Sequence, residues 1–302
     1  MLPTPEPERQ DATWLAGAEV AIVGLGLMGG SLAGALRGAG AAPRACRRVV
    51  GIVRRAETVA AAGPWVDTAT ADLAAVGTAD VVILAVPPRT ILQLLPIVAA
   101  QMRPGALLTD LGSTKSAIVE VMSSSPAGLL LAGGHPMCGK EAGGLAAADP
   151  QLYRGAPYLI CPVPSRPAAA VAHTAALARA LGAQPRVLDP ATHDQLVAAI
   201  SHVPYTGAVA LVLAAAQLDA PTGGAIWELV AGGFRDTTRV AAGELDMWID
   251  ILLTNRAEVL AHLQRLTGVL TTLATALAAE DTAALGAALG AAQERRRRLF
   301  RA

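Results

Sequence analysis

Charged and aromatic side chains are scarce in this sequence of 302 residues: 16% are charged, 3% are aromatic, and the formal net charge is zero. Proteins that bind nucleic acids typically carry a basic patch, and single-strand binders add aromatic platforms, so both scarcities argue against a nucleic-acid partner. Cysteine is also rare. Cys46, Cys138 and Cys161 are widely separated and lack any Cys-x-x-Cys spacing, so we expect neither a disulfide framework nor a metal site. This usage fits a reducing cytoplasm.

The sequence also lacks an export signal and a long apolar run. Residues 1–14 are acidic and proline-rich, whereas a secretory signal has a basic segment followed by an apolar one. The longest uncharged apolar stretch, residues 203–218, includes Pro204 and Gln217 and is shorter than the roughly 20 apolar residues of a membrane span. We therefore expect a cytoplasmic protein without membrane contact, in which this stretch is a buried helix.

The abundant Ala, Leu and Val residues follow two patterns. Up to residue 190, short apolar runs alternate with helical patterns, which is typical of βαβ units around a parallel sheet. The expected strands cover residues 20–23, 49–53, 81–86, 106–109, 129–132, 158–161 and 186–188. The predicted fold class is α/β: a disordered leader (1–17), an N-terminal Rossmann-type doubly wound parallel sheet (18–190) and an all-α C-terminal domain (191–302).

The expected C-terminal helices are rich in Ala and Leu on more than one face and carry few charges. Apolar helix faces of this kind are usually buried against another surface. We therefore predict a homodimer that forms through the helical domain. The basic run at residues 294–298 is interpreted as a solvated helix end rather than as a polyanion contact.

Residues 20–37 combine an apolar strand, a Gly-x-Gly-x-x-Gly turn and an amphipathic helix. In such a unit Gly24 permits the tight turn, Gly26 lets the backbone approach a pyrophosphate, and Gly29 allows close packing of helix on strand. The helix N-terminus adds partial positive charge for phosphates. The alternative is a glycine-rich turn without a ligand. We expect a dinucleotide site with contacts from Gly24, Leu25, Gly26, Leu27, Met28, Gly29, Val86 and Pro87.

The second strand bears on which dinucleotide binds. An NAD site usually has an acidic residue about 20 residues beyond the glycines, where it binds the ribose hydroxyls. Here the strand ends in Arg54 and Arg55, and no acid occurs before Glu57. A guanidinium can pair with a 2′-phosphate, so we predict that NADP is preferred and that NAD remains possible.

Two polar segments follow other expected strands, where ligands bind in open α/β sheets. In the first, Ser113 is expected from spacing alone to cap the helix that begins near Lys115. In the second, His135 lies among glycines and a proline, outside a regular element. Its ordinary pKa near 6.5 suits general acid or base catalysis, but a structural role is equally open at this point.

Polar residues also gather in the otherwise apolar helical half, in the segments 192–194, 201–205 and 233–239. His202 precedes Pro204, where a helix is expected to be interrupted and to make room for a ligand. A satisfied core histidine is the alternative. Arg239 is a candidate for clamping a substrate carboxylate.

These motifs occur in a specific order: GLGLMGGS at 24–31, DLGSTK at 110–115, GHPMCG at 134–139, HD at 193–194, SHVP at 201–204 and FRDTTR at 234–239, followed by Trp248. Over residues 18–265 the chain resembles the prephenate and arogenate dehydrogenases of tyrosine biosynthesis. The resemblance implies oxidative decarboxylation, in which hydride leaves C4 of the cyclohexadienyl ring and the ring carboxylate leaves as CO2.

The same resemblance implies roles for individual residues. His135 would accept the C4 hydroxyl proton, Ser113 would orient His135 and the nicotinamide, and Arg239 would bind a substrate carboxylate. Five further residues would shape the substrate pocket: Glu141, Ser201, His202, Tyr205 and Trp248.

The choice of substrate is less defined. Tyr205 stands where some prephenate-specific members carry a second histidine, but no acid is evident that would pair with the ammonium group of arogenate. We therefore expect prephenate, with arogenate as the alternative. A β-hydroxyacid-type dehydrogenase would typically place a lysine in its helical domain, and residues 191–302 contain none. A non-catalytic NADP sensor would need neither His135 nor Arg239.

Overall fold

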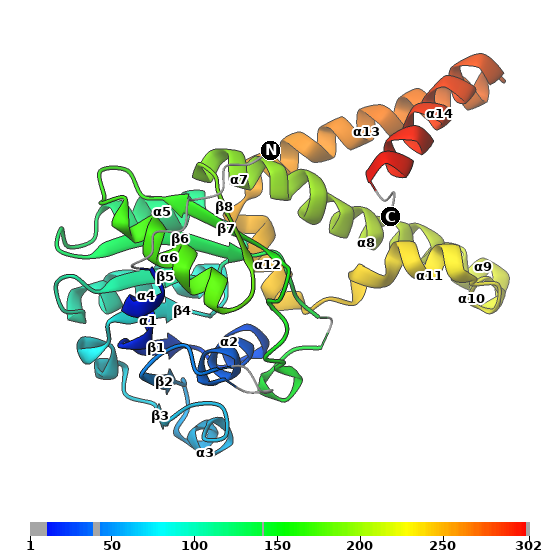
Figure 1. Cartoon of the computed structure of the whole chain (residues 1–302). Coiled ribbons are helices and arrows are strands. Elements are labelled where there is room, and N and C mark those ends of the chain that lie inside the picture. The colour runs from blue at the N-terminus through cyan, green and yellow to red at the C-terminus, as the bar shows by residue number, and fades with distance from the viewer. Residues whose placement is uncertain (1–10, 39–42, 141, 300–302) are drawn as a thin grey trace. The chain divides into compact units, whose positions relative to one another are not determined.

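The computed structural model describes residues 11–38, 43–140 and 142–299 (Figure 1). The chain forms two compact units, which divide after Asn255. The first unit holds the sheet and the helices up to α12, and the second holds α13 and α14.

Eight strands form one sheet in the order β3-β2-β1-β4-β5-β6-β7-β8. The strands from β3 to β6 are parallel, whereas β7 runs antiparallel to β6 and parallel to β8. The strands are β1 (Glu19–Val23), β2 (Arg48–Ile52), β3 (Thr68–Thr70), β4 (Val81–Leu84), β5 (Leu107–Asp110), β6 (Leu130–Pro136), β7 (Pro157–Pro162) and β8 (Gln184–Val187). The order of the first six is that of a doubly wound dinucleotide-binding sheet, so the predicted fold class is confirmed.

Helices cover both faces of this sheet. Val20 and Ile22 of β1 enter one core, whereas Ala21 and Val23 enter the other, because successive strand residues point to opposite faces. The first core is closed by α1 (Asp11–Ala16), α2 (Leu27–Arg37) and α6 (Ala169–Ala180), the second by α4 (Pro88–Gln101) and α5 (Ser116–Ser123). Short connecting helices are η1 (Ala56–Thr58), α3 (Val59–Ala62), η2 (Leu73–Thr78) and η3 (Leu145–Ala147).

The expected disordered leader needs a correction. Residues 1–10 lie outside the described residues, but Asp11–Ala16 form helix α1. Leu15 is buried in the core, and the ring of Trp14 stacks on His173 of α6 at a centroid distance of 4.0 Å. These contacts hold the segment against the sheet domain. The sequence pattern did not indicate them, because the residues before the helix are acidic and proline-rich.

One continuous helical segment, Pro190–Ala216, follows the sheet. It consists of α7 (Pro190–Val197), the π-helical turn η4 (Ala198–His202) and α8 (Val203–Ala216). By length and hydropathy alone this segment could cross a membrane, with 33% of its most apolar window buried. The expectation of a buried helix is wrong for most of α8, since only Val203, Tyr205 and Ala208 are buried there. Leu211 and Leu213 on the same helix are exposed.

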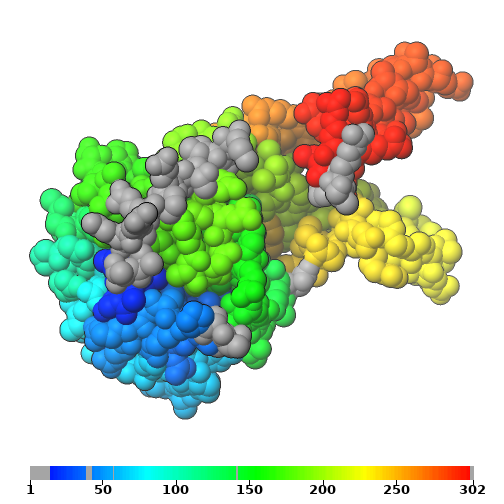
Figure 2. All heavy atoms as spheres, viewed as in Figure 1, coloured from blue at the N-terminus to red at the C-terminus, as the bar shows by residue number. Residues whose placement is uncertain are grey.

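The chain then continues through α9 (Asp219–Thr222), α10 (Ala225–Glu228), α11 (Gly232–Thr238), η5 (Arg239–Ala242) and α12 (Leu245–Thr254). None of the residues in α9 to α11 is buried. Figure 2 shows this segment in yellow at the molecular surface. Its exposed side chains include Trp227 and Leu229.

The second unit is a pair of helices, α13 (Arg256–Ala278) and α14 (Thr282–Leu299). The division after Asn255 differs from the domain boundary expected near residue 190. The reason is that polar bonds tie α7 and α12 to the sheet domain: Ser116 donates to Asp194 of α7, and Arg89 of α4 donates to Asp250 of α12.

Candidate active site

The turn between β1 and α2 is built on glycine. Gly24 has a φ of 98°, and a Cβ there would lie 2.6 Å from the carbonyl oxygen of Ala85. A Cβ on Gly29 would lie 1.9 Å from the carbonyl oxygen of Gly24. A larger residue at position 24 would therefore clash with the segment after β4, and one at position 29 would push α2 away from the carboxyl end of β1.

Gly26 is the N-cap of α2, and a Cβ added there would meet nothing within 4 Å. Leu27 and Met28 form the first turn of this helix. The helix N-terminus is therefore uncovered on the side where phosphate oxygens would approach the backbone N–H groups. These residues fit the pyrophosphate of a nicotinamide dinucleotide.

The other expected cofactor residues lie around the same turn. A Cβ on Gly24 would lie 2.6 Å from Cγ1 of Val86, which follows β4, the neighbour of β1. Pro87 is the N-cap of α4. On the other side, Leu25 leans over β2, where its Cδ1 lies 2.5 Å from the position of a Cβ on Gly51. The structure thus brings the residues after β1 and β4 together.

Arg54 and Arg55 follow β2, the other neighbour of β1, and both side chains are exposed. Arg55 is the N-cap residue of η1, and its carbonyl oxygen accepts hydrogen bonds from the backbone and side chain of Thr58. These two hydrogen bonds stabilise the turn that follows the two arginines.

His135 lies on strand β6, not in a loop as expected. β6 pairs with β5 only as far as Leu131, but β7 then provides an antiparallel partner, with Leu159 opposite His135. The sequence pattern missed this extension because glycine and proline are unfavourable in most strands. The side chain of His135 is buried.

A chain of hydrogen bonds extends from His135. Its Nδ1 lies 2.8 Å from Nε2 of His193 on α7, and Nδ1 of His193 lies 2.8 Å from Oδ1 of Asp194. His193 is completely buried and Asp194 nearly so. Three side chains from one strand and one helix are thus joined in a line.

Asp194 also holds the start of α5. Its Oδ1 accepts a hydrogen bond from the backbone N–H of Lys115 at 2.7 Å, and its Oδ2 accepts one from Ser116 at 2.8 Å. The helix begins at Ser116 with Lys115 as the N-cap, so the expected capping by Ser113 is wrong. A carboxylate distant in sequence replaces the local cap, and the partial positive charge of the helix N-terminus stabilises it.

A buried ion pair fixes β5 against β6 beside the histidines. Nζ of Lys115 binds Oδ1 of Asp110, and both side chains are fully buried. Oδ2 of Asp110 accepts a hydrogen bond from the backbone N–H of Gly134 at 3.2 Å. Glycine is required there, since a Cβ on Gly134 would lie 2.5 Å from the carbonyl oxygen of Asp110. The pair therefore sets the position of the residue next to His135.

These surroundings keep the site histidines neutral. Burial, followed by the proximity of His193, Lys115 and His202, lowers the pKa of His135 well below 6.5. Burial also lowers the pKa of His193, although its bond to Asp194 opposes this. Burial alone would raise the pKa of Asp194, but hydrogen bonds from His193, Ser116 and Lys115 outweigh it and hold that pKa below its usual value.

A second group of side chains surrounds His202, at the end of η4. The indole of Trp248 on α12 stacks on the ring of Tyr205 at 3.7 Å and meets His202 edge-on at 6.4 Å. Asn255 links this group to the first one, because its Nδ2 lies 2.8 Å from the carbonyl oxygen of Asp194 and 3.2 Å from Nδ1 of His202. Burial lowers the pKa of His202 to about 4.

The remaining expected residues lie on other segments. Ser113 and Ser201 are half-buried, on the segment after β5 and on η4. Arg239 begins η5 with an exposed side chain. Glu141 lies outside the described residues. The sequence analysis predicted neither the link made by Asn255 nor the helix cap formed by Asp194. Both depend on contacts between residues far apart in the chain.

Two family models match the chain: "Prephenate dehydrogenase, nucleotide-binding domain" over residues 32–187 and "Prephenate dehydrogenase, dimerization domain" over residues 189–291. Among curated relatives, a cyclohexadienyl dehydrogenase of Zymomonas mobilis is 32% identical over 87% of this chain and 89% of its own length. A prephenate dehydrogenase of Lactococcus lactis is 31% identical over 88% of this chain and 73% of its own.

Solved structures give the same result. A prephenate dehydrogenase from A. aeolicus, in complex with hydroxyphenyl propionate and NAD+, matches with a TM-score of 0.86 and 26% identity over 94% of this chain and 99% of that one. An arogenate dehydrogenase from Synechocystis matches with a TM-score of 0.80 and 32% identity over 93% and 100%. A 3-hydroxyisobutyrate dehydrogenase from Mycobacterium tuberculosis, with a TM-score of 0.55 and 19% identity over 81% and 87%, shares the fold alone.

Proposed function

The chain belongs to the prephenate dehydrogenase family and is an NAD(P)-dependent oxidoreductase, and we propose that it catalyses the oxidative decarboxylation of prephenate to 4-hydroxyphenylpyruvate in tyrosine biosynthesis. The observation that carries this proposal is His135, a buried neutral base beside the carboxyl end of a dinucleotide-binding sheet. Because Nδ1 of His135 is engaged with His193, Nε2 is the nitrogen left for a substrate hydroxyl.

A nicotinamide dinucleotide, held by Gly24, Gly26 and the N-terminus of α2, would supply the acceptor for the hydride that leaves C4 of the ring. His135 takes the proton of the C4 hydroxyl as the hydride leaves, so that a carbonyl forms at C4. When the ring carboxylate then leaves as CO2, the electron pair of its bond moves through the ring onto the C4 oxygen, which takes a proton back to give the aromatic phenol. Neutral imidazole is the form that can accept this proton, and the low pKa of His135 keeps it in that form near neutral pH. Ser113, on the segment between β5 and α5, is proposed to orient His135 and the nicotinamide.

Substrate binding is proposed to use the group around His202. Tyr205 and Trp248 form a stacked aromatic pair, and the cyclohexadienyl ring is proposed to pack against this pair. Ser201 and Glu141 would add polar contacts, and Arg239 would bind a substrate carboxylate. We expect Arg239→Gln to act chiefly on KM, whereas a large loss of kcat at unchanged KM would contradict this role.

We propose NADP as the preferred cofactor. Arg54 and Arg55 support this, since they are exposed at the end of β2, where a 2′-phosphate would lie. The A. aeolicus relative was crystallised with NAD+, so NAD use has a direct precedent in the family. A higher kcat/KM with NAD than with NADP would refute the preference.

Arogenate remains the second candidate substrate, because the Synechocystis relative is an arogenate dehydrogenase. Prephenate ends in a ketone and arogenate in an ammonium group, and Tyr205 offers no charge to bind the latter. The test is a spectrophotometric assay of the purified chain with each substrate, against NADP and NAD in turn. Cofactor reduction with prephenate supports the proposal, and reduction with arogenate alone refutes it. Dinucleotide binding without turnover in all four combinations would favour a sensor.

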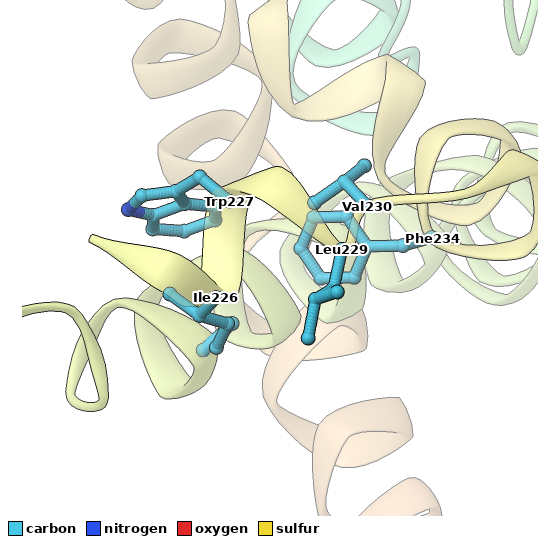
Figure 3. A pocket seen from close by; sticks show the side chains of 6 residues that line it. Ile226, Trp227, Leu229, Val230 and Phe234 are labelled. Carbon is cyan, nitrogen blue, oxygen red and sulfur yellow. The ribbon is translucent and has the colours of Figure 1, made fainter. Parts of the chain in front are cut away.

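Assembly is proposed to occur through residues 191–302, as an all-α domain that forms a homodimer. An apolar pocket of about 220 Å³ lies on this part of the chain, lined by Ala215, Ile226, Trp227, Leu229, Val230 and Phe234 (Figure 3). The family model that matches here is a dimerization domain, so a second copy is the cover that we propose for the apolar faces of α8 to α11. A monomeric mass by light scattering would overturn this.

We also propose a cytoplasmic location. All three cysteines are unpaired, and burial raises the pKa of the Cys46 and Cys138 thiols to about 11, which keeps them unreactive. Cell fractionation tests this location, and recovery in the membrane fraction would contradict it.

A further inference from the structure

We propose that His193 and Asp194 are positioning residues that hold His135 in the one tautomer able to accept the substrate proton, and that they stabilise the positive charge His135 then acquires. This inference rests on the proposed role of His135 as the base. The observation behind it is the line of two 2.8 Å hydrogen bonds from His135 through His193 to Asp194.

The direction of each hydrogen bond follows from the charge at the far end. Asp194 accepts two backbone N–H bonds from the start of α5, and this holds its carboxylate in the anionic form. A carboxylate can only accept, so Nδ1 of His193 must carry the proton that points at it. Neutral His193 then has its lone pair on Nε2.

The same argument passes to the next ring. Nε2 of His193 can only accept, so Nδ1 of His135 must donate across the 2.8 Å that separates them. Neutral His135 therefore has its lone pair on Nε2, the nitrogen that faces away from His193. With Asp194 anionic and both histidines neutral, no other placement of the two protons satisfies both bonds. The base is thus oriented before substrate arrives.

The line also acts during the reaction. When Nε2 of His135 takes the hydroxyl proton, the substrate O–H bond breaks and the new N–H bond forms, and no other bond in the line has to break. The cationic ring keeps its Nδ1–H bond to His193, whose own N–H points at the anionic Asp194. The negative charge therefore stabilises the imidazolium through His193, among side chains that are buried.

Other charged groups around the line are already paired. Nζ of Lys115 is bound to Asp110, both packed against β6 from the β5 side. His202, from the η4 side, bonds through Nδ1 to Asn255. The thiol of Cys161 on β7 is buried, and burial raises its pKa to about 12, which leaves it uncharged. Asp194 is thus the anion to which His193 is bonded.

A direct test is the tautomer of His135 in the wild-type protein. The chain has five histidines, so nitrogen NMR of histidine-labelled protein can resolve each ring. We expect His135 to carry its proton on Nδ1 above pH 7. A proton on Nε2 would overturn the proposal. This readout needs no turnover, so it stays informative even if the assays with prephenate and arogenate fail.

Two variants of His193 separate positioning from packing. His193→Leu removes the acceptor, and we expect kcat to fall about 10²- to 10⁴-fold with KM nearly unchanged, comparable to the loss when a catalytic histidine is held in the wrong tautomer. His193→Gln keeps a carbonyl oxygen at the position of Nε2, so it should restore at least tenfold of that loss and keep the Nδ1–H tautomer.

The matched control is His262→Leu, the same substitution on α13, which should leave kcat and the His135 tautomer unchanged. Melting curves and NADP affinity show whether each variant is folded.

If folded His193→Leu keeps wild-type kcat and an Nδ1–H His135, the proposal is wrong. If wild-type protein turns over neither substrate but shows the Nδ1–H tautomer, the proposed function fails and the positioning stands. If His193→Leu does not fold, the wild-type tautomer and His193→Gln decide the question.

Discussion

The sheet domain and the helices that follow it differ in how far their hydrophobic side chains are buried. In the sheet, β1, β4 and β5 are buried throughout, and helices of the same chain cover both faces. Along α8 to α10, by contrast, Leu213 is 62% and Leu229 82% exposed. The first region completes its core within one chain, whereas the second leaves large apolar side chains exposed.

The catalytic groups follow this division. The proposed base His135 and the ion pair beside it are buried in the self-contained region, where neighbours in the same chain set the pKa of the histidine. The residues proposed to clamp substrate, such as Arg239, lie on the region whose surface is open. Substitutions of buried groups such as His135 should therefore affect turnover or stability, whereas substitutions on the exposed faces of α8 to α11 should affect assembly.

The largest effect is expected in the sheet domain, from His135→Asn. It removes the imidazole that accepts the hydroxyl proton, so kcat should fall about 10²- to 10⁴-fold. NADP affinity, measured by fluorescence titration, should not change. Turnover at the wild-type rate would show that His135 is not the base. It would also contradict the placement of the proton-accepting group in the sheet domain.

Lys115→Met should be the most destabilising single change. It leaves the carboxylate of Asp110 buried without its counterion, which costs about 3–5 kcal/mol of the free energy of unfolding. Urea unfolding curves measure this. The control is Lys140→Met, which removes the exposed pair with Asp149 and should leave the unfolding curve nearly unchanged, because water screens such pairs. Equal losses would show that the buried pair does not support β5 and β6.

Leu229→Asp should weaken the dimer without unfolding the chain. Burying one leucine contributes about 1.5–3 kcal/mol, and the substitution removes one from each copy, so the dimer dissociation constant should rise at least about 100-fold. Light scattering over a dilution series measures the change. Ile97→Asp, at a half-exposed site on α4 of the sheet domain, should leave the mass unchanged. If Ile97→Asp dissociates the dimer and Leu229→Asp does not, the contrast between the two regions is reversed.

Mild acid should destabilise the protein through its buried histidines. The pKa of His202 is about 4 in the folded chain, below the ordinary 6.5, so unfolding binds a proton at intermediate pH. The stability is therefore complete above pH 6.5 and falls as the pH drops from 6.5 toward 4. Between pH 7.5 and pH 5 this group alone should cost about 2 kcal/mol. Thermal melts across this range measure it, and a flat profile would contradict the burial of His202.

The smallest effect is expected at the exposed arginines. Arg54→Ala and Arg55→Ala should each lower kcat/KM with NADP about tenfold, because a charge-assisted hydrogen bond to a phosphate is worth about 1.5–3 kcal/mol. Activity with NAD should not change. Arg103→Ala, at an exposed arginine paired with Asp80, is the control. An equal loss with both cofactors would assign the two arginines to folding.

Local patterns predicted much of this structure. The seven expected strands are all present, and the glycines of the first turn have the conformations that their spacing requires. The short strand β3 was missed, since three half-buried residues carry too little hydrophobic signal. The extension of β6 through His135 was also missed, because it depends on a partner strand more than 20 residues later.

The sequence by itself determined the class of fold, the dinucleotide turn and the identity of His135 as a candidate base, because each follows from residues close together in the chain. Tertiary structure alone decided what His135 is bonded to. The cap of α5 by Asp194, the line through His193 and the link made by Asn255 join residues that are 53 to 79 positions apart. Buried polar groups must find partners wherever the fold brings them, and no local pattern records that choice.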